Sequence, residues 1–222
     1  MKILCLFWSN PSMYPFLREK ISYLKKKKIK TTFISRYGYS VHIGHRQVQK
    51  DNYHGNFLKN NCKSFIIPGS RNFVIDKLYF FYFILFSCFK CFIDKPDKVF
   101  IYHRTTLLII YLIKFFFKGE IIYQNFDYNP EVKCNSLFSK FINWSELFLS
   151  KYVDLFIFSH PKRAQIFSKN SKINKNKTIY VYNSLRIKPF TKKTKNKKNM
   201  IWQGSIGPGH SLINIIRSFV YL

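Results

Sequence analysis

Polar side chains that could do chemistry follow two apolar runs of the sequence. Asp127 comes shortly after the run at 120–123, and His103 follows the run at 98–102 directly, beside Arg104. Both residues are therefore expected at the carboxyl ends of strands, where α/β sheets place their ligand crevice. Asp127 could contact a ligand there, or it could cap the next turn. His103 could also face a ligand, although a lone histidine more often has a structural role.

A glycine-rich turn stands near the end of the chain. Gly204-Ser205-Ile206-Gly207-Pro208-Gly209 separates a strand-like run at 199–203 from a helix-like run at 211–221. Strand, glycine loop and helix in this order open a Rossmann-like unit, although a glycine-rich turn alone is more often only a turn. Because one strand and one helix cannot form a domain, we expect 199–222 to be the truncated start of a second domain.

The elements that must position these residues alternate between strands and helices. Apolar and β-branched runs predict strands at 2–7, 31–35, 64–68, 98–102, 120–123, 154–159 and 178–182. Helical spacing of apolar residues predicts helices at 15–28, 71–93, 105–117, 137–152 and 161–168. The polar segment 36–63 is expected to be a long loop with one short helix. This alternation predicts an α/β fold with a Rossmann-like, doubly wound parallel sheet over residues 1–185.

Composition narrows the function classes. Hydrophobic residues make up 47% of the 222 residues and aromatic residues 19%, so the chain can build a core and bulk disorder is excluded. The formal charge of +28 favours anionic partners such as phosphates, nucleic acid or a membrane surface. AT-rich codons could account for part of this charge. The basic run 186–198 is predicted to be a linker. A nucleic-acid patch is the alternative, but no recognisable nucleic-acid motif supports it, and we expect no nucleic-acid partner.

The cysteines indicate the cellular compartment, and the apolar stretches indicate how the chain could contact a membrane. The five cysteines are odd in number and no secretion signal accompanies them, which predicts a reduced, cytoplasmic protein. Cys88 and Cys91 form a lone CxxC without the second pair that zinc usually needs, so no metal is expected. The stretches at 78–93 and 107–117 are shorter than the roughly 20 residues that span a bilayer. Their aromatics beside lysines suit a membrane interface, which predicts peripheral contact at the inner face of the cell membrane.

Five segments, in order along the chain, carry a resemblance to a known family. They are the run Lys95–His103 (KPDKVFIYH), the run 121–131 (IIYQNFDYNPE), Glu146 followed by Tyr152-Val153-Asp154, the run Tyr182-Asn183-Ser184, and the run 203–207 (QGSIG) with the apolar positions 212–219. Together they resemble a GT-B glycosyltransferase of the family 4 (group 1) type. The likeness covers the N-terminal domain and the start of the C-terminal domain, and it depends on the order and spacing of motifs that are weak singly.

The resemblance implies an activity, and it indicates which part of such an enzyme this sequence lacks. Such enzymes transfer a sugar from a nucleotide-sugar, here to a cell-envelope or lipid-linked glycan. They need no metal or other cofactor, since backbone amides and cationic side chains stabilise the diphosphate. No Asp or Glu occurs after Asp154, so the carboxylates of the donor site are absent from this chain. We therefore expect a fragment that is inactive alone. The alternative is a non-catalytic acceptor-binding subunit completed by a separate donor-domain chain.

The resemblance also implies roles for individual residues. Asp127 is expected to be catalytic, in contact with the acceptor or the transferred sugar. Asn125 stands where a histidine is expected in many relatives, which argues against intact catalysis. The substrate-binding residues are expected to be Ser9, Asn10, His103, Asn125 and Asn183. The amides for the donor diphosphate are expected from Gly204, Ser205 and Gly207.

Overall fold

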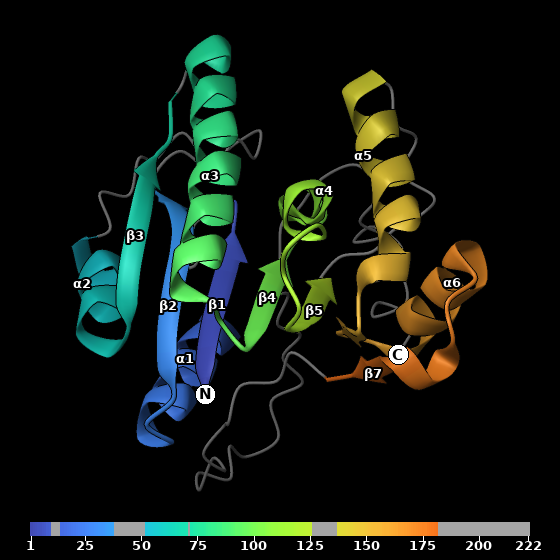
Figure 1. Cartoon of the computed structure of the whole chain (residues 1–222), viewed down its shortest axis with the longest axis horizontal. Coiled ribbons are helices and arrows are strands. Elements are labelled where there is room, and N and C mark those ends of the chain that lie inside the picture. Colours follow the sequence, from blue (N-terminus) through green and yellow to red (C-terminus); the bar gives the residue numbers. More distant parts are fainter. Residues whose placement is uncertain (10–13, 38–51, 71, 126–136, 182–222) are drawn as a thin grey trace, which may run out of the picture. The chain divides into compact units, whose positions relative to one another are not determined.

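Seven parallel strands form one sheet (Figure 1). The computed structural model describes residues 1–9, 14–37, 52–70, 72–125 and 137–181. The strand order is β3-β2-β1-β4-β5-β6-β7, and every neighbouring pair is parallel. The predicted α/β fold with a doubly wound parallel sheet is confirmed. The strands are β1 (Lys2–Phe7), β2 (Lys30–Tyr37), β3 (Lys63–Pro68), β4 (Lys98–Tyr102), β5 (Glu120–Asn125), β6 (Leu155–Phe158) and β7 (Thr178–Tyr180).

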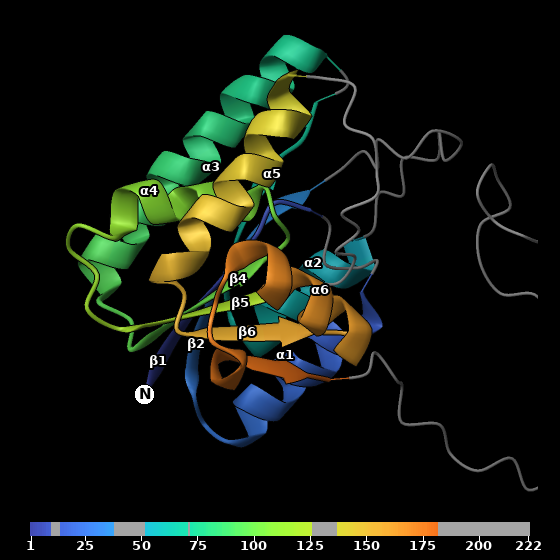
Figure 2. The ribbon, with the colours of Figure 1, turned by 90° about the vertical axis from the view of Figure 1, so that its right-hand side faces the viewer.

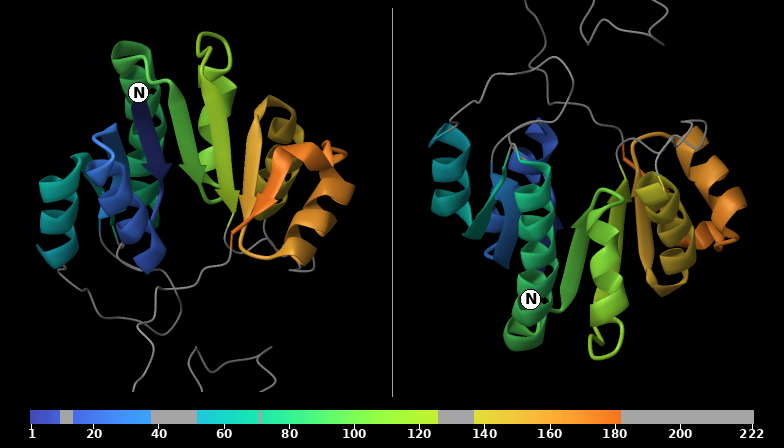
Figure 3. Two further views of the ribbon diagram at one scale, coloured as in Figure 1. Left: turned by 90° about the horizontal axis from the view of Figure 1, so that it is seen from below. Right: turned by 90° about the horizontal axis from the view of Figure 1, so that it is seen from above.

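Helices cover both faces of the sheet. Helices α1 and α2 lie on one face, and α3, α4 and α5 lie on the other (Figures 2 and 3). Helix α6 packs Phe167 against Phe156 and Phe158 of β6, at ring-centroid distances of 5.3 and 5.2 Å. The helices are α1 (Pro15–Lys26), α2 (Asn52–Asn61), α3 (Phe73–Asp94), α4 (Ile110–Ile113), α5 (Leu137–Leu149) and α6 (Pro161–Ser171), with the 3-10 turns η2 (Thr106–Ile109), η3 (Ser150–Tyr152) and η4 (Lys175–Lys177).

The helix expected over 105–117 is shorter in the structure. It consists of the 3-10 turn η2 and the single α-helical turn α4. After Ile113 the chain tightens, because the amides of both Phe116 and Phe117 donate to the Ile113 carbonyl, at 3.1 and 2.8 Å. This compact turn leads directly into Gly119 and β5. The sequence prediction was therefore right about the helical start of this segment and wrong about its length.

The sheet reverses its direction of growth between β1 and β4. The chain runs from β1 through α1 to β2 and through α2 to β3, and α3 then returns it to the opposite side of β1. Strand β1 pairs with both β2 and β4, and Phe7 at its end is in register with Tyr102 at the end of β4. In open α/β sheets a ligand crevice forms outside the carboxyl ends of the strands at such a switch point.

One turn fixes the opposite edge of the sheet. The Asp97 carboxylate accepts a hydrogen bond from the Lys2 amide at 2.6 Å, and the Asp97 amide donates to the Lys2 carbonyl at 2.9 Å. The Asp97 carbonyl accepts from the Glu120 amide at 3.0 Å. A Cβ at Gly119 would lie 2.4 Å from that carbonyl oxygen, so only glycine fits there. The starts of β1, β4 and β5 are therefore held together by backbone contacts.

The sheet has a core on each face. Side chains of a strand alternate between faces, and both faces of β1 are buried, as is usual for parallel sheets. One core includes Leu4 and Leu6 of β1 with residues of α3 and α4. The other includes Ile3, Cys5 and Phe7 of β1 with Leu17, Ile21 and Leu24 of α1.

Helix α3 is the longest of the described helices. The Asn72 side chain caps it by accepting hydrogen bonds from the amides of Val74 and Ile75, at 2.9 and 3.3 Å. It ends at Lys95, which has a left-handed backbone with φ 42°. None of the helices in the described ranges is long and apolar enough to cross a membrane. The buried stripe of α3 consists of Phe80, Phe83, Ile84, Ser87 and Cys91.

Replacing a buried phenylalanine of α3 should cost far more stability than replacing an exposed neighbour. Phe83 is fully buried against Trp8, whereas Phe81 is 64% exposed. We expect Phe83→Ala to lower the free energy of unfolding by about 3–5 kcal/mol. Phe81→Ala should change it by about 0.5 kcal/mol or less. Urea unfolding followed by circular dichroism measures both, and equal losses would contradict this orientation of α3.

Candidate functional site

The segments that follow β1 and β4 are joined across the switch point. The Trp8 amide donates a hydrogen bond to the Thr106 hydroxyl at 3.0 Å. Thr106 is fully buried at the start of η2, and Ser9 is the next residue after Trp8. The His103 amide donates to the carbonyl of Gln124 in β5 at 3.3 Å. The carboxyl ends of β1, β4 and β5 thus form one connected edge.

His103 lies at this edge in a strained backbone conformation. Its φ is 71°, in the left-handed region that residues other than glycine rarely adopt. Its ring nitrogen Nδ1 lies 3.0 Å from the Thr105 hydroxyl. Such strain costs on the order of 1–3 kcal/mol and clusters at active sites and ligand contacts. The other described non-glycine residues with positive φ, Lys28, Lys95 and Lys172, lie at or just after the ends of helices, whereas His103 follows a strand. The conformation of His103 therefore supports the crevice as the functional part of the sheet.

A buried hydrogen-bond network lies behind the crevice. The Tyr123 hydroxyl donates to Glu146 Oε1 at 2.6 Å, and Asn125 Nδ2 donates to the same oxygen at 2.7 Å. Asn125 Nδ2 also lies 3.0 Å from the Tyr123 hydroxyl, which accepts from it. Tyr123 and Asn125 come from β5, whereas Glu146 comes from α5. The network therefore fixes α5 to the end of β5.

Burial determines the protonation behaviour of this network. It raises the pKa of the Glu146 carboxyl, while the hydrogen bonds from Tyr123 and Asn125 and the nearby charge of Arg104 act in the opposite direction. Burial and the neighbouring Glu146 raise the pKa of Tyr123 well above its ordinary value. Tyr123 is therefore a hydrogen-bond donor at neutral pH. A carboxyl with a raised pKa is a group that can hold a proton close to a ligand crevice.

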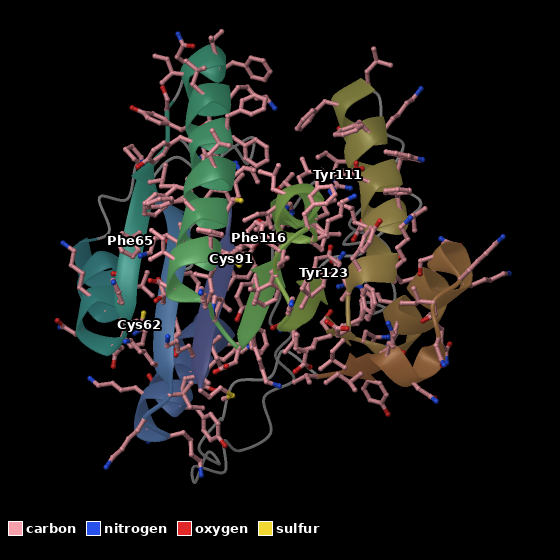
Figure 4. The ribbon with its side chains drawn as sticks, in the orientation of Figure 1. Cys62, Phe65, Cys91, Tyr111, Phe116 and Tyr123 are labelled. Carbon is pink, nitrogen blue, oxygen red and sulfur yellow. The ribbon has the colours of Figure 1, made fainter. Side chains whose placement is uncertain are left out.

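Arg104 supplies positive charge beside the crevice. Its Nη1 donates a hydrogen bond to Asn143 Oδ1 at 2.8 Å. Asn143 precedes Glu146 by three residues, so both lie on the same side of α5. Tyr111 of α4 donates its hydroxyl proton to Ser145 at 3.3 Å. In Figure 4, Tyr111 is labelled between α4 and α5, and Tyr123 is labelled below it, at β5.

A second cation borders the β1 side of the edge. Arg36, near the end of β2, forms an ion pair with Asp76 in the first turn of α3. Its guanidinium carbon lies 5.0 Å from the centre of the Trp8 ring. Asp76 also accepts from the Ser70 amide at 3.3 Å. Burial lowers the pKa of Arg36 and the Asp76 charge opposes that shift. This pair holds the start of α3 next to the residue that follows β1.

The structure describes three of the residues expected to bind substrate or take part in catalysis. Ser9 and His103 follow neighbouring strands at the crevice, and the Asn125 amide donates to Glu146 behind it. The expected site residues outside the described ranges are Asn10, Asp127, Asn183, Gly204, Ser205 and Gly207.

Sequence reasoning missed the role of Glu146 in the network. The sequence pattern indicated no part in a site for this residue, yet it is 3% exposed and accepts two hydrogen bonds. A signal was available, because Glu146 is the one carboxylate in the apolar segment 137–152.

Metal binding has no support in the described ranges, which contain no group of three His, Cys, Asp or Glu residues able to hold an ion. Cys88 and Cys91 lie on α3 as free thiols.

Comparison with known proteins gives a similarity in fold. No family model matches the chain, and no curated protein is similar to it in sequence. Among solved structures, the chain is similar to one Rossmann-like domain of GT-B glycosyltransferases. It spans less than half the length of each structure described next, so the similarity concerns one domain of those proteins.

Three solved structures illustrate this similarity. HepE from Anabaena in complex with UDP is 14% identical with a TM-score of 0.53, and 83% of this chain covers 44% of that one. The apo form of the lipopolysaccharide outer core galactosyltransferase WaaB is 15% identical with a TM-score of 0.55, and 85% of this chain covers 47% of WaaB. Sucrose-phosphate synthase from Thermosynechococcus elongatus is 11% identical with a TM-score of 0.55, and 82% of this chain covers 48% of it.

Two substitutions at His103 should separate its backbone strain from its side chain. His103→Gly and His103→Ala both remove the imidazole, but only glycine adopts a φ of 71° without strain. We therefore expect His103→Gly to be more stable than His103→Ala by about 1 kcal/mol. Chemical denaturation of both variants measures the difference. Equal stability would contradict the left-handed conformation.

The buried Glu146 carboxyl should make stability depend on pH. Because its pKa is raised in the folded state, its contribution is fully present below the unfolded-state pKa and is lost as pH rises through the folded pKa. Glu146→Gln removes this titration. The stability of the variant relative to wild type should therefore rise with pH, by about 1.4 kcal/mol for each unit by which the pKa is raised. Unfolding from pH 4 to pH 8 measures it, and Glu19→Gln, at an exposed position of α1, is the matched control. If the difference in unfolding free energy between Glu146→Gln and wild type does not change with pH, the raised pKa of the buried carboxyl is contradicted.

Proposed function

We propose that this chain is the acceptor-side half of a glycosyltransferase that moves a sugar from a nucleotide-sugar to a cell-envelope or lipid-linked glycan. The observation that carries the proposal is the seven-stranded parallel sheet of the described residues, in a domain that is similar in fold to about half of several GT-B glycosyltransferases. HepE was crystallised with UDP and with UDP-glucose, which supports a uridine nucleotide-sugar as the donor. In this proposal the domain is formed by 1–185, the linker by 186–198, and 199–222 begins the donor-binding domain.

The proposed roles follow the position of the crevice. His103 and Ser9, at the ends of neighbouring strands, contact the acceptor together with Asn10 and Asn183. Asp127, two residues after β5, is the catalytic carboxylate. Asn125 belongs to the same group but acts from behind the crevice, because its amide is bonded to Glu146. Amides of Gly204, Ser205 and Gly207 hold the donor diphosphate, as backbone N–H groups before a helix can do.

The chemistry requires stabilisation of two charges. Glycosyl transfer passes through an oxocarbenium-like centre and releases a diphosphate. Arg104 and the amides of the glycine-rich turn are the cationic and dipolar groups that this chain offers for it. No acidic residue follows Asp154 in this sequence, and we propose that the groups that bind the donor sugar lie outside these residues. The chain alone is therefore proposed to bind the acceptor without turnover, in the cytoplasm and in peripheral contact with the inner face of the membrane.

A second candidate is a non-catalytic acceptor-binding subunit paired with a separate donor-domain chain. The observation that favours it is Asn125, whose Nδ2 donates two hydrogen bonds within a buried network, at a position where the resemblance leads us to expect a histidine. Both candidates require acceptor binding by this chain. They differ in whether Asp127 takes part in the reaction.

Substitution of Asp127 distinguishes the two candidates. The full chain is co-expressed with a donor domain of a UDP-glucose-dependent GT-B enzyme, and sugar transfer to lipid-linked envelope saccharides is measured. For the catalytic candidate, Asp127→Asn should lower kcat about a hundredfold or more. Lys172→Gln, on an exposed turn after α6, is the control and should leave kcat unchanged.

Two results would contradict the proposals. If the full chain binds none of the saccharides in an equilibrium assay, both candidates are wrong. If it binds them and Asp127→Asn leaves kcat unchanged, the catalytic role of Asp127 is wrong and the subunit candidate remains.

A further inference from the structure

Helices α3 and α5 present large apolar side chains to solvent. We use the term aromatic face for Leu78, Phe81, Leu85 and Phe89 of α3 with Phe141 and Trp144 of α5. These side chains are between 46% and 64% exposed. On α3 they are spaced by three or four residues, so they form one stripe along the helix, opposite its buried stripe. Figure 4 shows side chains projecting from α3 and α5 along their lengths.

Ring and cation contacts link the helices that carry the aromatic face. The Lys77 ammonium of α3 lies 3.7 Å from the ring centre of Phe138 of α5, which links the starts of the two helices. Trp144 stacks on Phe148 at 5.1 Å, and Phe148 stacks on Tyr111 of α4 at 6.3 Å. Helices α3, α4 and α5 lie side by side on the same face of the sheet (Figure 3). Contiguous apolar surfaces of this kind mark interaction sites.

The opposite face of the sheet does not share this property. Among the described side chains of α1 and α2, Tyr23 is the one large apolar side chain that is exposed. A general drift of the composition towards phenylalanine would affect both faces. The concentration of exposed aromatics on α3 and α5 therefore belongs to this surface.

The charge of the aromatic face is positive. Lys77, Lys140 and Lys151 lie on or next to α3 and α5. The acidic groups of these helices are engaged elsewhere: Asp76 pairs with Arg36, Asp94 pairs with Lys90, and Glu146 is buried. The surface thus offers ammonium groups and aromatic rings together, with the described carboxylates turned to other partners.

This combination points to lipid more than to protein. Cores of protein interfaces are depleted in lysine. Helices that lie in the plane of a membrane interface combine Phe, Trp and Leu on one face with lysines beside them. We propose that the aromatic face rests on an anionic lipid surface, with its rings among the upper acyl chains and its lysines at the phosphate groups. The proposal deepens the proposed function, because it would bring the crevice to a lipid-linked acceptor.

Co-sedimentation of the full chain with vesicles tests the proposal. The chain should bind phosphatidylcholine vesicles that contain phosphatidylglycerol at least about tenfold more tightly than pure phosphatidylcholine vesicles, since each lysine near an anionic surface contributes about fivefold. Phe81→Ser combined with Trp144→Ser should weaken binding by about tenfold or more, because two large apolar side chains are lost from the interface. Lys77→Gln combined with Lys140→Gln should weaken it by about the product of two fivefold effects.

Matched controls lie on α1. Tyr23→Ser removes an exposed aromatic, and Lys26→Gln with Lys27→Gln removes the same charge as the test pair. These controls should leave vesicle binding unchanged. Trp144 fluorescence should also shift to the blue on binding, and Trp144→Phe should lose that shift while still sedimenting. Circular dichroism confirms that each variant is folded.

Three results would overturn the proposal. These are equal binding to neutral and anionic vesicles, equal losses for the α1 controls and the aromatic-face variants, and concentration-dependent dimers that Phe81→Ser with Trp144→Ser abolishes in the absence of vesicle binding. The proposed function is tested separately. Saccharide binding without vesicle binding leaves the acceptor-side role standing and contradicts only the membrane contact, whereas vesicle binding without saccharide binding contradicts the acceptor-side role and not the lipid contact.

Discussion

The structure depends on the contacts that hold the ends of β1 and β4 together where the sheet changes direction. The segments that follow β1 and β4 run towards opposite sides of the sheet, so neither segment covers the carboxyl ends of both strands. A ligand crevice is therefore expected above them. The bond from the Trp8 amide to the buried Thr106 hydroxyl joins them at the base, and the strained His103 stands at the rim. The fold thereby places polar groups from three strands along one edge.

The same topology explains why α3 is long and why it is exposed. It must return the chain from the edge strand β3 across the sheet to β4, beyond β1. Its buried stripe covers the core, and its start is fixed by the Arg36–Asp76 ion pair. With no further layer described above it, its other side offers an apolar stripe to the surroundings. The crossover that creates the crevice thus also supplies most of the surface that we propose to rest on lipid.

Much of the fold could be predicted because buried parallel strands are short continuous apolar runs, which the sequence shows clearly. The direction in which α5 faces could not be predicted. The apolar spacing at Leu137, Phe141, Trp144, Leu147 and Phe148 indicated the helix correctly, yet all of these side chains except Leu147 are exposed. The buried stripe of α5 contains the polar residues Ser145 and Glu146. Their burial is tolerated because Tyr111 and Tyr123 donate hydrogen bonds to them.

The candidate site was less predictable than the fold. The position of His103 at the end of a strand followed from the strand prediction itself. Its left-handed backbone did not, since Tyr-His-Arg-Thr contains no glycine that would suggest such a conformation. The Glu146 network joins residues more than 20 positions apart, so it exists only once α5 has packed against β5. Local patterns cannot report contacts of that kind.

Hydrogen exchange of the full chain tests the central claim most directly, with and without anionic vesicles that carry a lipid-linked saccharide. The account predicts slower exchange in peptides covering 103–106 at the crevice and 73–92 on α3, and unchanged exchange over α1. Protection of α1 in place of α3, or no change at 103–106 while the saccharide is bound, would contradict it.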